Sequence, residues 1–491
     1  MAMQYEAVIG LEVHAELLTE TKIFCGCRAT FGAEPNTHVC PVCLGAPGAL
    51  PVLNARVLDF AIMAGRALNA AIAPVSKFDR KNYFYPDLPK AYQISQLDQP
   101  ICERGWLTIT VGEDERRIGI TRIHMEEDAG KLVHQGAAGL AGSTHSLVDL
   151  NRAGVPLLEI VSEPELRTPE EARAYMLELR AILVYLGIND GRLEQGSLRC
   201  DANVSVRPVG QAALGTKAEI KNMNSFSAIE RAIRYEIQRQ LDAVACGERI
   251  IQETRLWNEE RQVTVSMRVK EGSADYRYFP DPDLIPLHIS RDQVAEIEAR
   301  LPELPAAKRA RYEAAFGLSP YDARVLVADK QVADFFDAAV EAAGGAASGR
   351  AKALANWLTG DVAAALNADK LTLAETRLTP AHLAELVALI EADTISGKIG
   401  KALLPAMIAE GAAPGGLVEA RGLSQIQDTG ALGQAIEQVL GAHPDQVADY
   451  RAGKTKVLGF LVGQVMRATQ GRAKPDLVNR LLQEALGRQP G

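Results

Sequence analysis

Apolar and polar side chains alternate at every second position in many segments of the first 290 residues, which is typical of strands with one buried face. Residues 198–207 alternate without a break. Residues 106–111 also alternate, turn at Gly112 and return through Ile118 and Ile120. Two alternating runs joined by a short turn predict an antiparallel hairpin. The first half of the chain therefore predicts mainly antiparallel sheet, with a few helices between the strands.

Apolar residues have helical spacing in one segment before Ser290 and throughout the chain after it. Ser227 followed by Glu230 predicts a capping box at a helix start. The predicted helix has one apolar stripe, formed by Ile229, Ile233, Ile237, Leu241 and Val244. Beyond Ser290, apolar residues recur at spacings of 3 and 4 to the end of the chain, which predicts helices throughout. Glycine-rich loops at 344–349 and 411–416 interrupt this part.

The length of 491 residues exceeds what one compact core normally holds, since typical domains have about 100–200 residues. We therefore expect an α+β protein with three domains. A cradle built on a mainly antiparallel sheet would occupy residues 1–290, a helical domain residues 291–410, and a helical tail domain residues 411–491.

Composition narrows the class of protein. Hydrophobic residues make up 47% and charged residues 23%, and no run of 18 apolar residues could span a bilayer. The first ten residues lack a cationic signal segment, so we expect a cytoplasmic protein without a membrane partner.

The net charge of −9 requires any nucleic-acid site to be a local basic patch. Seven cysteines, none beyond Cys246, are too few for a disulfide framework.

Four of these cysteines have the spacing of a zinc site. Cys25 and Cys27 form a C-x-C pair, and Cys40 and Cys43 form a C-x-x-C pair, with glycines and prolines between them. Such pairs place four thiolates around one zinc ion, and a site closed by four sulfurs is structural. The alternatives are small buried side chains or a redox pair, although no thioredoxin-like strand and helix flank the second pair.

Acidic residues gather at three places in the cradle. Ile9, Leu11, Val13 and Leu17 would share one face of the first strand, which puts Glu12, His14 and Glu16 on the other. A second cluster, Glu126, Glu127 and Asp128, follows His124, and the third place is Glu253 on a strand over 250–257. Each cluster is either a solvated face or is neutralised by a cation. Spacing alone does not show whether they meet.

Five longer runs resemble one family: 9–14 (IGLEVH), 78–87 (FDRKNYFYPD), 124–131 (HMEEDAGK), 197–205 (SLRCDANVS) and 275–280 (DYRYFP). They are similar to the B subunit of glutamine-dependent aspartyl/glutamyl-tRNA(Asn/Gln) amidotransferases, and the likeness runs from end to end. The glycine- and alanine-rich segment 135–143 is longer than the family pattern.

The resemblance implies ATP-dependent phosphorylation of the side-chain carboxylate of Glu-tRNA(Gln) or Asp-tRNA(Asn), followed by amidation. It also implies that Glu12, His14, Glu127 and Glu253 surround a catalytic magnesium, with His14 bound weakly or through water. The four cysteines match the zinc knuckle of some members. We find no cysteine or serine nucleophile motif for glutamine hydrolysis, so ammonia would come from a partner, the amidase or A subunit, accompanied by a small C subunit.

Several residues are candidates to bind the phosphates or the substrate carboxylate, although lone cations are commonly solvent-facing. They are Arg80, Lys81, Lys131, Arg199 and Lys217. Asp201 and Asn203 share the polar face with Arg199 and could hold a second metal shell or the nucleotide. The chain has no phosphate-binding loop of the G-x-x-x-x-G-K-[ST] type. Lys454 belongs to the nearest match, but Ala448 stands at the first glycine position. ATP would therefore bind in the cradle.

The tail is locally basic. Its cations are Arg451, Lys454, Lys456, Arg467, Arg472 and Lys474, with no acidic residue between the first and the last. The helix among them would pack through Val457, Leu458, Phe460, Leu461 and Val465. We expect this face to bind tRNA away from its acceptor end, the alternative being ordinary solvated lysines.

Two further functions compete with the amidotransferase. One is a zinc-knuckle RNA-binding scaffold whose acidic face is solvated. The other is a free-standing ATP-dependent ligase that joins an amine to a small carboxylic acid without tRNA. The sequence also leaves open whether Asp-tRNA, Glu-tRNA or both are substrates.

Overall fold

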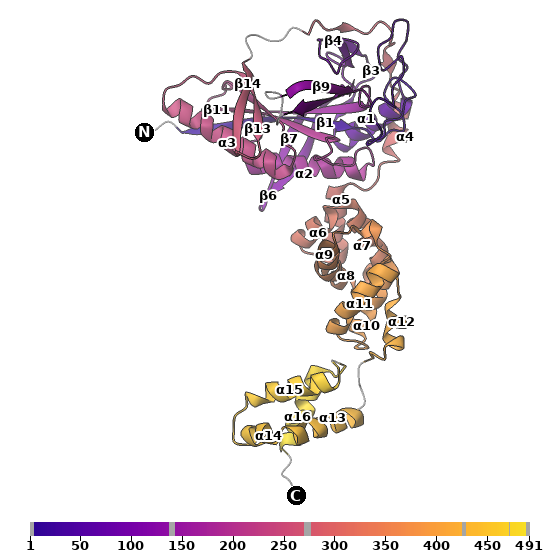
Figure 1. Ribbon diagram of the computed structural model, residues 1–491, viewed down its shortest axis with the longest axis vertical. Helices are drawn as coiled ribbons and strands as arrows, with labels where there is room; N and C mark the ends of the chain where they lie inside the picture. Colours follow the sequence, from indigo (N-terminus) through magenta and orange to yellow (C-terminus); the bar gives the residue numbers. More distant parts are fainter. Residues whose placement is uncertain (1–3, 137–142, 270–275, 425–428, 471, 488–491) are drawn as a thin grey trace. The chain divides into compact units, whose positions relative to one another are not determined.

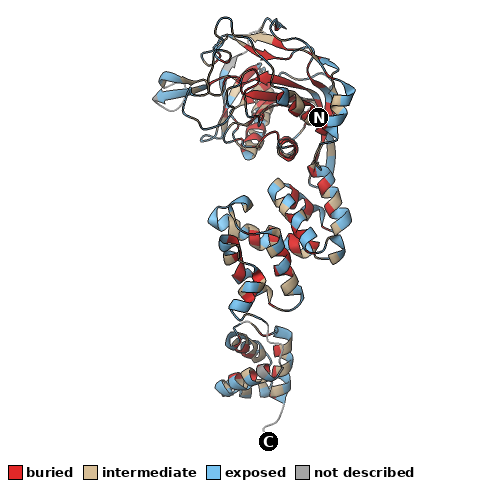
Figure 2. Ribbon diagram, turned by 90° about the vertical axis from the view of Figure 1, so that its right-hand side faces the viewer, coloured by how far each residue is buried: buried red, intermediate tan, exposed pale blue. Residues whose placement is uncertain are grey.

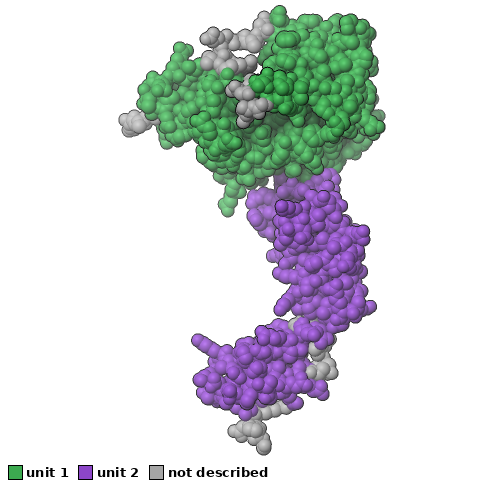
Figure 3. All heavy atoms as spheres, viewed as in Figure 1, with its two compact units in different colours: residues 1–305 green, residues 306–491 purple. Residues whose placement is uncertain are grey.

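The computed structural model describes the chain except for residues 1–3, 137–142, 270–275, 425–428, 471 and 488–491. It separates into two compact units, residues 1–305 and residues 306–491 (Figure 3). Most of the segment 135–143 that departs from the family pattern, together with Asp275, lies outside the described residues. The α+β class is confirmed, with strands in the first unit and helices in the second (Figure 1).

A nine-stranded sheet is the framework of the first unit, in the order β14-β13-β12-β11-β1-β10-β7-β6-β2. Its strands are β1 (Tyr5–Glu16), β2 (Ala71–Ile72), β6 (Cys102–Val111), β7 (Asp114–Glu127), β10 (Pro156–Ser162), β11 (Leu198–Pro208), β12 (Ala218–Lys221), β13 (Glu253–Asn258) and β14 (Val263–Val269). All neighbours are antiparallel except β12 and β13. The predicted hairpin is therefore confirmed as β6 and β7.

Three helices contribute to the core against one face of this sheet: α1 (Ala55–Ala67), α2 (Pro169–Tyr185) and α3 (Phe226–Ala245). Strand β1 shows why the two faces differ. Ile9, Leu11 and Val13 are buried in the hydrophobic core, and the residues between them point to the other face. Buried residues concentrate in the sheet and on the inner sides of these helices (Figure 2).

Helix α3 begins two residues before the predicted start. Ser225, not Ser227, is the N-cap, and its hydroxyl accepts a hydrogen bond from the Ala228 N–H at 3.0 Å. The apolar stripe starts as predicted at Ile229 and continues through Ile233. It then includes two polar side chains, Glu236 and Gln240, which are fully buried.

Smaller strand groups complete the first unit. A three-stranded sheet is formed by β4 (Asp79–Asn82), β5 (Tyr92–Ser95) and β15 (Phe279–Pro280). Two pairs are formed by β8 (Lys131–Gly136) with β9 (Ser143–Asp149), and by β3 (Val75–Ser76) with β16 (Leu287–His288). Helix α4 (Arg291–Glu298) contacts α1, with a 2.8 Å ion pair between Arg66 and Glu298. The first helix beyond 290 thus packs within the first unit.

The second unit is helical. Its α-helices are α5 (Pro305–Phe316), α6 (Pro320–Val327), α7 (Lys330–Ala342), α8 (Ala351–Trp357), α9 (Ala363–Asp369), α10 (Pro380–Glu391), α11 (Gly397–Glu410), α12 (Pro414–Ala420), α13 (Thr429–Ala442), α14 (Pro444–Arg451), α15 (Val457–Ala468) and α16 (Pro475–Gly487). Ser319, Asp329 and Thr379 cap α6, α7 and α10 with their side chains. Among the described helices, none is both long and apolar enough to cross a membrane.

The last four helices have a hydrophobic cluster of their own, between Leu432 and Leu486. Leu461 and Val465 of α15 are fully buried in it, as the sequence predicts. Phe460 is different: it is 44% exposed and contacts the His443 ring instead of the cluster. It lies next to Leu461 and so points away from the face that Leu461 buries.

Candidate active site

A cavity of about 300 Å³ lies on the polar face of the large sheet. Its lining residues are Glu12, His14, Lys81, Ser95, Arg122, His124, Glu159, Asp201, Asn203, Lys217, Glu219, Lys221, Tyr276 and Tyr278. Pairing of β1 with β10 and β11 sets His14 opposite Glu159 on one side and Arg199 on the other. Alternation along β1 then brings Glu12 and His14 to the same face.

Two histidines and two glutamates meet beside this cavity. His14 Nε2 lies 3.6 Å from Glu126 Oε1 and 3.4 Å from Glu159 Oε2. His124 Nε2 lies 3.7 Å from Glu126 Oε2 and 3.3 Å from Glu159 Oε2. Burial lowers the pKa of His124, but the charges of Glu159 and Glu126 outweigh it and raise this pKa to about 9. Burial likewise lowers the pKa of His14, and Glu159 and Glu126 raise it overall.

These side chains fit a divalent cation. One ligand atom from each of His14, Glu126 and Glu159 lies within 4.8 Å of the others. Burial would raise the pKa of both carboxyls, but the two imidazoles outweigh it and lower them, so both are ionised at neutral pH. Two carboxylates and one imidazole would leave further positions of an octahedral magnesium to water and phosphate oxygens. Glu12 lies nearby and accepts a 2.8 Å hydrogen bond from Asn203.

Glu127 does not join this cluster, contrary to the expected ligand set. It follows Glu126 on β7 and therefore points to the opposite side of the strand. Its Oε1 accepts a hydrogen bond from the Ile94 N–H at 2.9 Å and forms an ion pair with Lys90. The Lys90 and Glu127 side chains are 10% and 4% exposed, so this pair is largely buried.

Glu253 also lies elsewhere. The parallel register of β12 and β13 sets it opposite the buried Ala218, on the face covered by α3. There its carboxylate binds Ser266 and Arg255 and lies 3.9 Å from Arg239 of α3. Glu126 and Glu159 thus occupy the places at His14 that the sequence assigned to Glu127 and Glu253.

Of the predicted phosphate-binding cations, Lys81 and Lys217 line the cavity. Burial lowers the pKa of Lys81, but the charges of Glu126 and other neighbours outweigh it, so Lys81 remains charged. Its ammonium lies 5.1 Å from the centre of the Tyr276 ring. Arg80, its neighbour on β4, points the other way and binds Asp281 and Asp283, each at 2.8 Å.

Arg199 lies opposite His14 in the register of β1 and β11 but does not line the cavity. Its guanidinium lies 2.6 Å from Asp128. Lys131 lines a second cavity of about 210 Å³ together with Glu16. Burial and the Asp128 carboxylate raise the pKa of Glu16 to about 8.

Asp201 and Asn203 reach the first cavity, as the alternation of 198–207 predicts. Asp201 forms an ion pair with Lys221, and Lys221 also lies 3.1 Å from Glu219. Lys221 and Glu219 were not predicted, because β12 is short and gives no extended pattern.

Glu159 is the most important residue that the sequence analysis missed. It is the only charged residue in β10, whose other residues are apolar or small. A single charged residue in such a buried strand indicates that its carboxylate has a partner, since burying it unpaired would cost free energy. Its position opposite His14 depends on strand register, which local pattern does not give.

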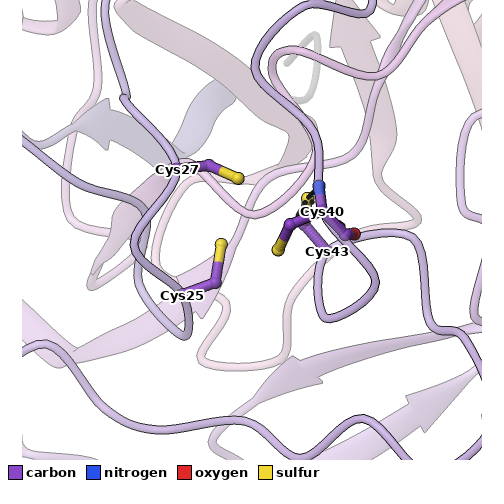
Figure 4. Close-up of side chains that lie close together, drawn as sticks. All are labelled: Cys25, Cys27, Cys40 and Cys43. Carbon is purple, nitrogen blue, oxygen red and sulfur yellow. Dashed lines mark hydrogen bonds between the residues drawn. The ribbon is translucent and has the colours of Figure 1, made fainter.

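The four cysteines come together as predicted. Their sulfurs face a common point and all lie within 4.8 Å of one another (Figure 4). Cys40 Sγ and Cys43 Sγ are 3.9 Å apart, close to the ~3.8 Å expected for two sulfurs bound tetrahedrally at ~2.3 Å. A hydrogen bond from the Cys25 thiol and the charge of Lys22 lower the pKa of Cys43 to about 4. The donor set therefore fits zinc.

Lys22 is fully buried beside this centre. Its ammonium donates to His38 O at 2.7 Å and Leu150 O at 3.3 Å, and lies 3.7 Å from Cys43 Sγ. No carboxylate of the described residues forms an ion pair with it. A zinc ion held by four thiolates would carry two net negative charges, and Lys22 would supply part of the compensating charge.

The tail cations differ in their contacts. Lys454 is paired with Asp449 at 2.8 Å, and Lys474 with Asp393 at 2.6 Å. Arg451 and Arg472 donate to the Leu486 and Gly422 carbonyls. Lys456 and Arg467 are exposed and form no ion pair with any described residue.

The sequence matches two family models. Residues 7–295 match the GatB/GatE catalytic domain, and residues 334–486 match the GatB domain. The chain is 59% identical to the B subunit of the aspartyl/glutamyl-tRNA(Asn/Gln) amidotransferase of Thermosynechococcus vestitus, over 99% of this chain and 97% of that protein. It is 57% identical to the protein of the same name from Acaryochloris marina, over 98% of each chain. The chain therefore belongs to the family of aspartyl/glutamyl-tRNA(Asn/Gln) amidotransferase B subunits.

Proposed function

We propose that this chain activates the side-chain carboxylate of Glu-tRNA(Gln), Asp-tRNA(Asn) or both with ATP, and that it amidates the activated group. The observation that carries the proposal is the meeting of His14, Glu126 and Glu159 beside a cavity with several cations. Such a site matches a magnesium-bound nucleotide and an anionic substrate. Amide formation needs this activation because a carboxylate is a poor electrophile.

The proposed reaction has two steps. A carboxylate oxygen of the substrate attacks the γ-phosphorus of ATP, and ADP leaves with the electrons of the broken P–O bond. Ammonia then adds to the acyl carbon, the C–O bond to phosphate breaks, and phosphate leaves while the nitrogen loses a proton. Both steps gather negative charge, so positioning and charge neutralisation are the main requirements.

The side chains of the cavity would meet these requirements in different ways. His14, Glu126 and Glu159 would bind magnesium, which neutralises phosphate charge during transfer. Lys81 and Lys217 would bind phosphate or carboxylate oxygens from the walls.

Other parts of the chain would serve binding and stability. The four cysteines would hold a structural zinc. The last four helices would form a tail domain that binds tRNA through Lys456 and Arg467. A partner amidase, the A subunit, would supply the ammonia, accompanied by the small C subunit.

Reconstitution tests the proposal. The chain is combined with its partner subunits, ATP, glutamine and each mischarged tRNA, and the amino acid released from the tRNA is identified. ATP-dependent formation of glutamine or asparagine on tRNA is expected. Amidation of free glutamate or aspartate without tRNA would favour the small-acid ligase. Full activity of Glu126→Gln would favour a scaffold whose acidic face is solvated.

A further inference from the structure

Arg122 of β7 lines the first cavity, although the sequence did not point to it. It precedes His124 by two positions on the strand, so both side chains lie on the polar face. A β-bulge makes this possible. The pairing of β7 with β10 skips Thr121, so that Ile120 packs in the core while Arg122 faces the cavity.

The Arg122 guanidinium has no carboxylate partner. Its Nη1 donates to the Leu97 carbonyl at 3.4 Å, and no aspartate or glutamate of the described residues forms an ion pair with it. By contrast, Arg80 binds two aspartates and Arg199 binds Asp128. The other N–H groups of Arg122 are therefore available to an anionic ligand in the cavity.

Lys81 and two tyrosines lie close to this guanidinium. Burial raises the pKa of Tyr278, and the charges of Lys81 and Arg122 both oppose the rise, so both cations lie near this phenol. The Tyr276 ring is 6.1 Å from the Tyr278 ring and 5.1 Å from the Lys81 ammonium. Lys81, like Arg122, forms no ion pair with a described residue. Two unpaired cations thus face the cavity beside aromatic rings.

These cations lie on one side of the candidate metal ligands. Arg122 pairs with Val161 of β10, two positions from Glu159. At a strand spacing of about 4.8 Å and a rise of about 3.4 Å per residue, the Arg122 and Glu159 backbones are roughly 8 Å apart. Lys217 directly precedes β12, which lies beyond β1 and β11 in the sheet. The cavity therefore has cations on both sides of the cluster.

We propose that Arg122 and Lys81 bind the side-chain carboxylate of the glutamyl or aspartyl group and hold it for attack on the γ-phosphorus. The inference rests on the proposed function, because it assigns two residues to the group that is activated. The planar guanidinium matches the two oxygens of a carboxylate. The tyrosine rings match the short apolar stem of the side chain, whereas a triphosphate is charged along its whole length. Lys217, on the other side, remains available to phosphate oxygens.

Arg122 would then also distinguish the substrate from the product. Amidation replaces one carboxylate oxygen with an NH₂ group, which removes the negative charge and introduces hydrogen-bond donors. A guanidinium has only donors and cannot accept from them. The amide should therefore bind more weakly than the acid, which favours release of the product.

Equilibrium binding of Glu-tRNA(Gln) and Gln-tRNA(Gln) to the assembled complex tests this assignment, without ATP so that no activation occurs. The two ligands differ only in carboxylate and amide, so contacts with the tRNA body cancel in the ratio of affinities. Wild type should prefer Glu-tRNA(Gln) by about 10- to 100-fold, as expected for charge-assisted hydrogen bonds. Arg122→Met should lose most of this preference. Arg122→Lys, which keeps the charge without the planar group, should keep only part of it.

Arg117→Met is the matched control, because Arg117 is an exposed arginine of the same strand that does not line the cavity. It should keep the wild-type ratio. Equal affinity of wild type for both tRNAs, or an unchanged ratio in Arg122→Met, overturns the assignment. Weaker ATP binding by Arg122→Met with an unchanged ratio would assign the residue to the phosphates instead.

Two further measurements keep the outcomes separate. If Arg122→Met does not assemble, Arg122→Lys decides, and a wild-type ratio in that variant overturns the assignment. Amidation of Glu-tRNA(Gln) by wild type with ATP and ammonium chloride tests the proposed function by itself. Its failure would overturn that function whatever the ratio of affinities.

Discussion

Glu126 and Glu127 are neighbours in the sequence but face opposite sides of β7. Glu126 lies 3.6 Å from His14 at the candidate metal site, whereas Glu127 pairs with Lys90 away from the cavity. The two carboxylates should therefore have separable roles, one in activation and one in stability.

Replacing Glu127 with Gln should mainly affect stability. Among the described residues, the substitution leaves Lys90 with no charged partner in a largely buried environment, and breaking such pairs costs about 3–5 kcal/mol. ATP-dependent activation of the folded variant should persist. Urea unfolding of wild type and Glu127→Gln measures the first effect, and ADP release with mischarged tRNA measures the second. An unchanged unfolding free energy would contradict this role.

Lys22 should strengthen zinc binding. Lys22→Met removes the buried ammonium that lies 3.7 Å from Cys43 Sγ and so leaves the charge of the thiolates less compensated. A loss of about 10- to 100-fold in zinc affinity is expected, as for other residues that support metal ligands. Competition with a chromophoric chelator measures it, with the exposed Lys352→Met as control. Equal zinc affinity in Lys22→Met and Lys352→Met would show that Lys22 does not support zinc binding.

Acid should weaken the contact between α5 and α7. Burial raises the pKa of Asp337, but Arg311 and Lys308 outweigh it and lower this pKa. A lowered carboxyl pKa contributes stability that is present above the unfolded pKa, near 3.8, and is lost as pH falls through the folded value. Asp337→Asn should therefore increase hydrogen exchange in α5 and α7 at pH 7.

The same variant should differ little from wild type at a pH below the folded pKa of Asp337, because the carboxyl is then protonated in both states. The exposed Asp369→Asn serves as control. A difference that persists unchanged under acid conditions would show that Asp337 acts through packing and not through charge.

The tail cations should contribute unequally to tRNA binding. Lys456 and Arg467 form no ion pair with described residues, whereas Lys454 is held by Asp449. Removing one cation that neutralises a phosphate should reduce the salt slope of binding by about 0.7–0.9. Lys456→Ala and Arg467→Ala should thus flatten the slope more than Lys454→Ala does. Equal slopes in all three variants and wild type would make this face an ordinary solvated surface.

The sequence predicted what depends on local pattern. Alternation placed Glu12 and His14 on one face of β1 and Asp201 and Asn203 on one face of β11, and the structure brings all four to the cavity. The cysteine spacing likewise predicted the cluster of four sulfurs. These features need only the two-residue period of a strand or a short loop.

Features that depend on register were not predictable in this way. Glu159 meets His14 only because β10 pairs with β1 in one particular alignment. The parallel pairing of β12 and β13 turns Glu253 to the α3 face, and a shift of one residue would have turned it to the cavity. The sequence predicted Ser227 as the N-cap of α3, whereas the structure has Ser225. Both serines stand within two residues of the helix start, so the local pattern does not choose between them.

Transfer of the γ-phosphate of ATP is the most direct test of the metal site. ADP release that depends on Glu-tRNA(Gln), without a nitrogen source, is measured for Glu126→Gln, Glu159→Gln and Glu253→Gln in the assembled complex. The first two variants should lose at least about 100-fold in rate, since each removes a carboxylate expected to hold the ion. Glu253→Gln should retain most of the rate, because Glu253 lies on the other face of the sheet. Normal rates in Glu126→Gln and Glu159→Gln, with loss in Glu253→Gln, would contradict this account.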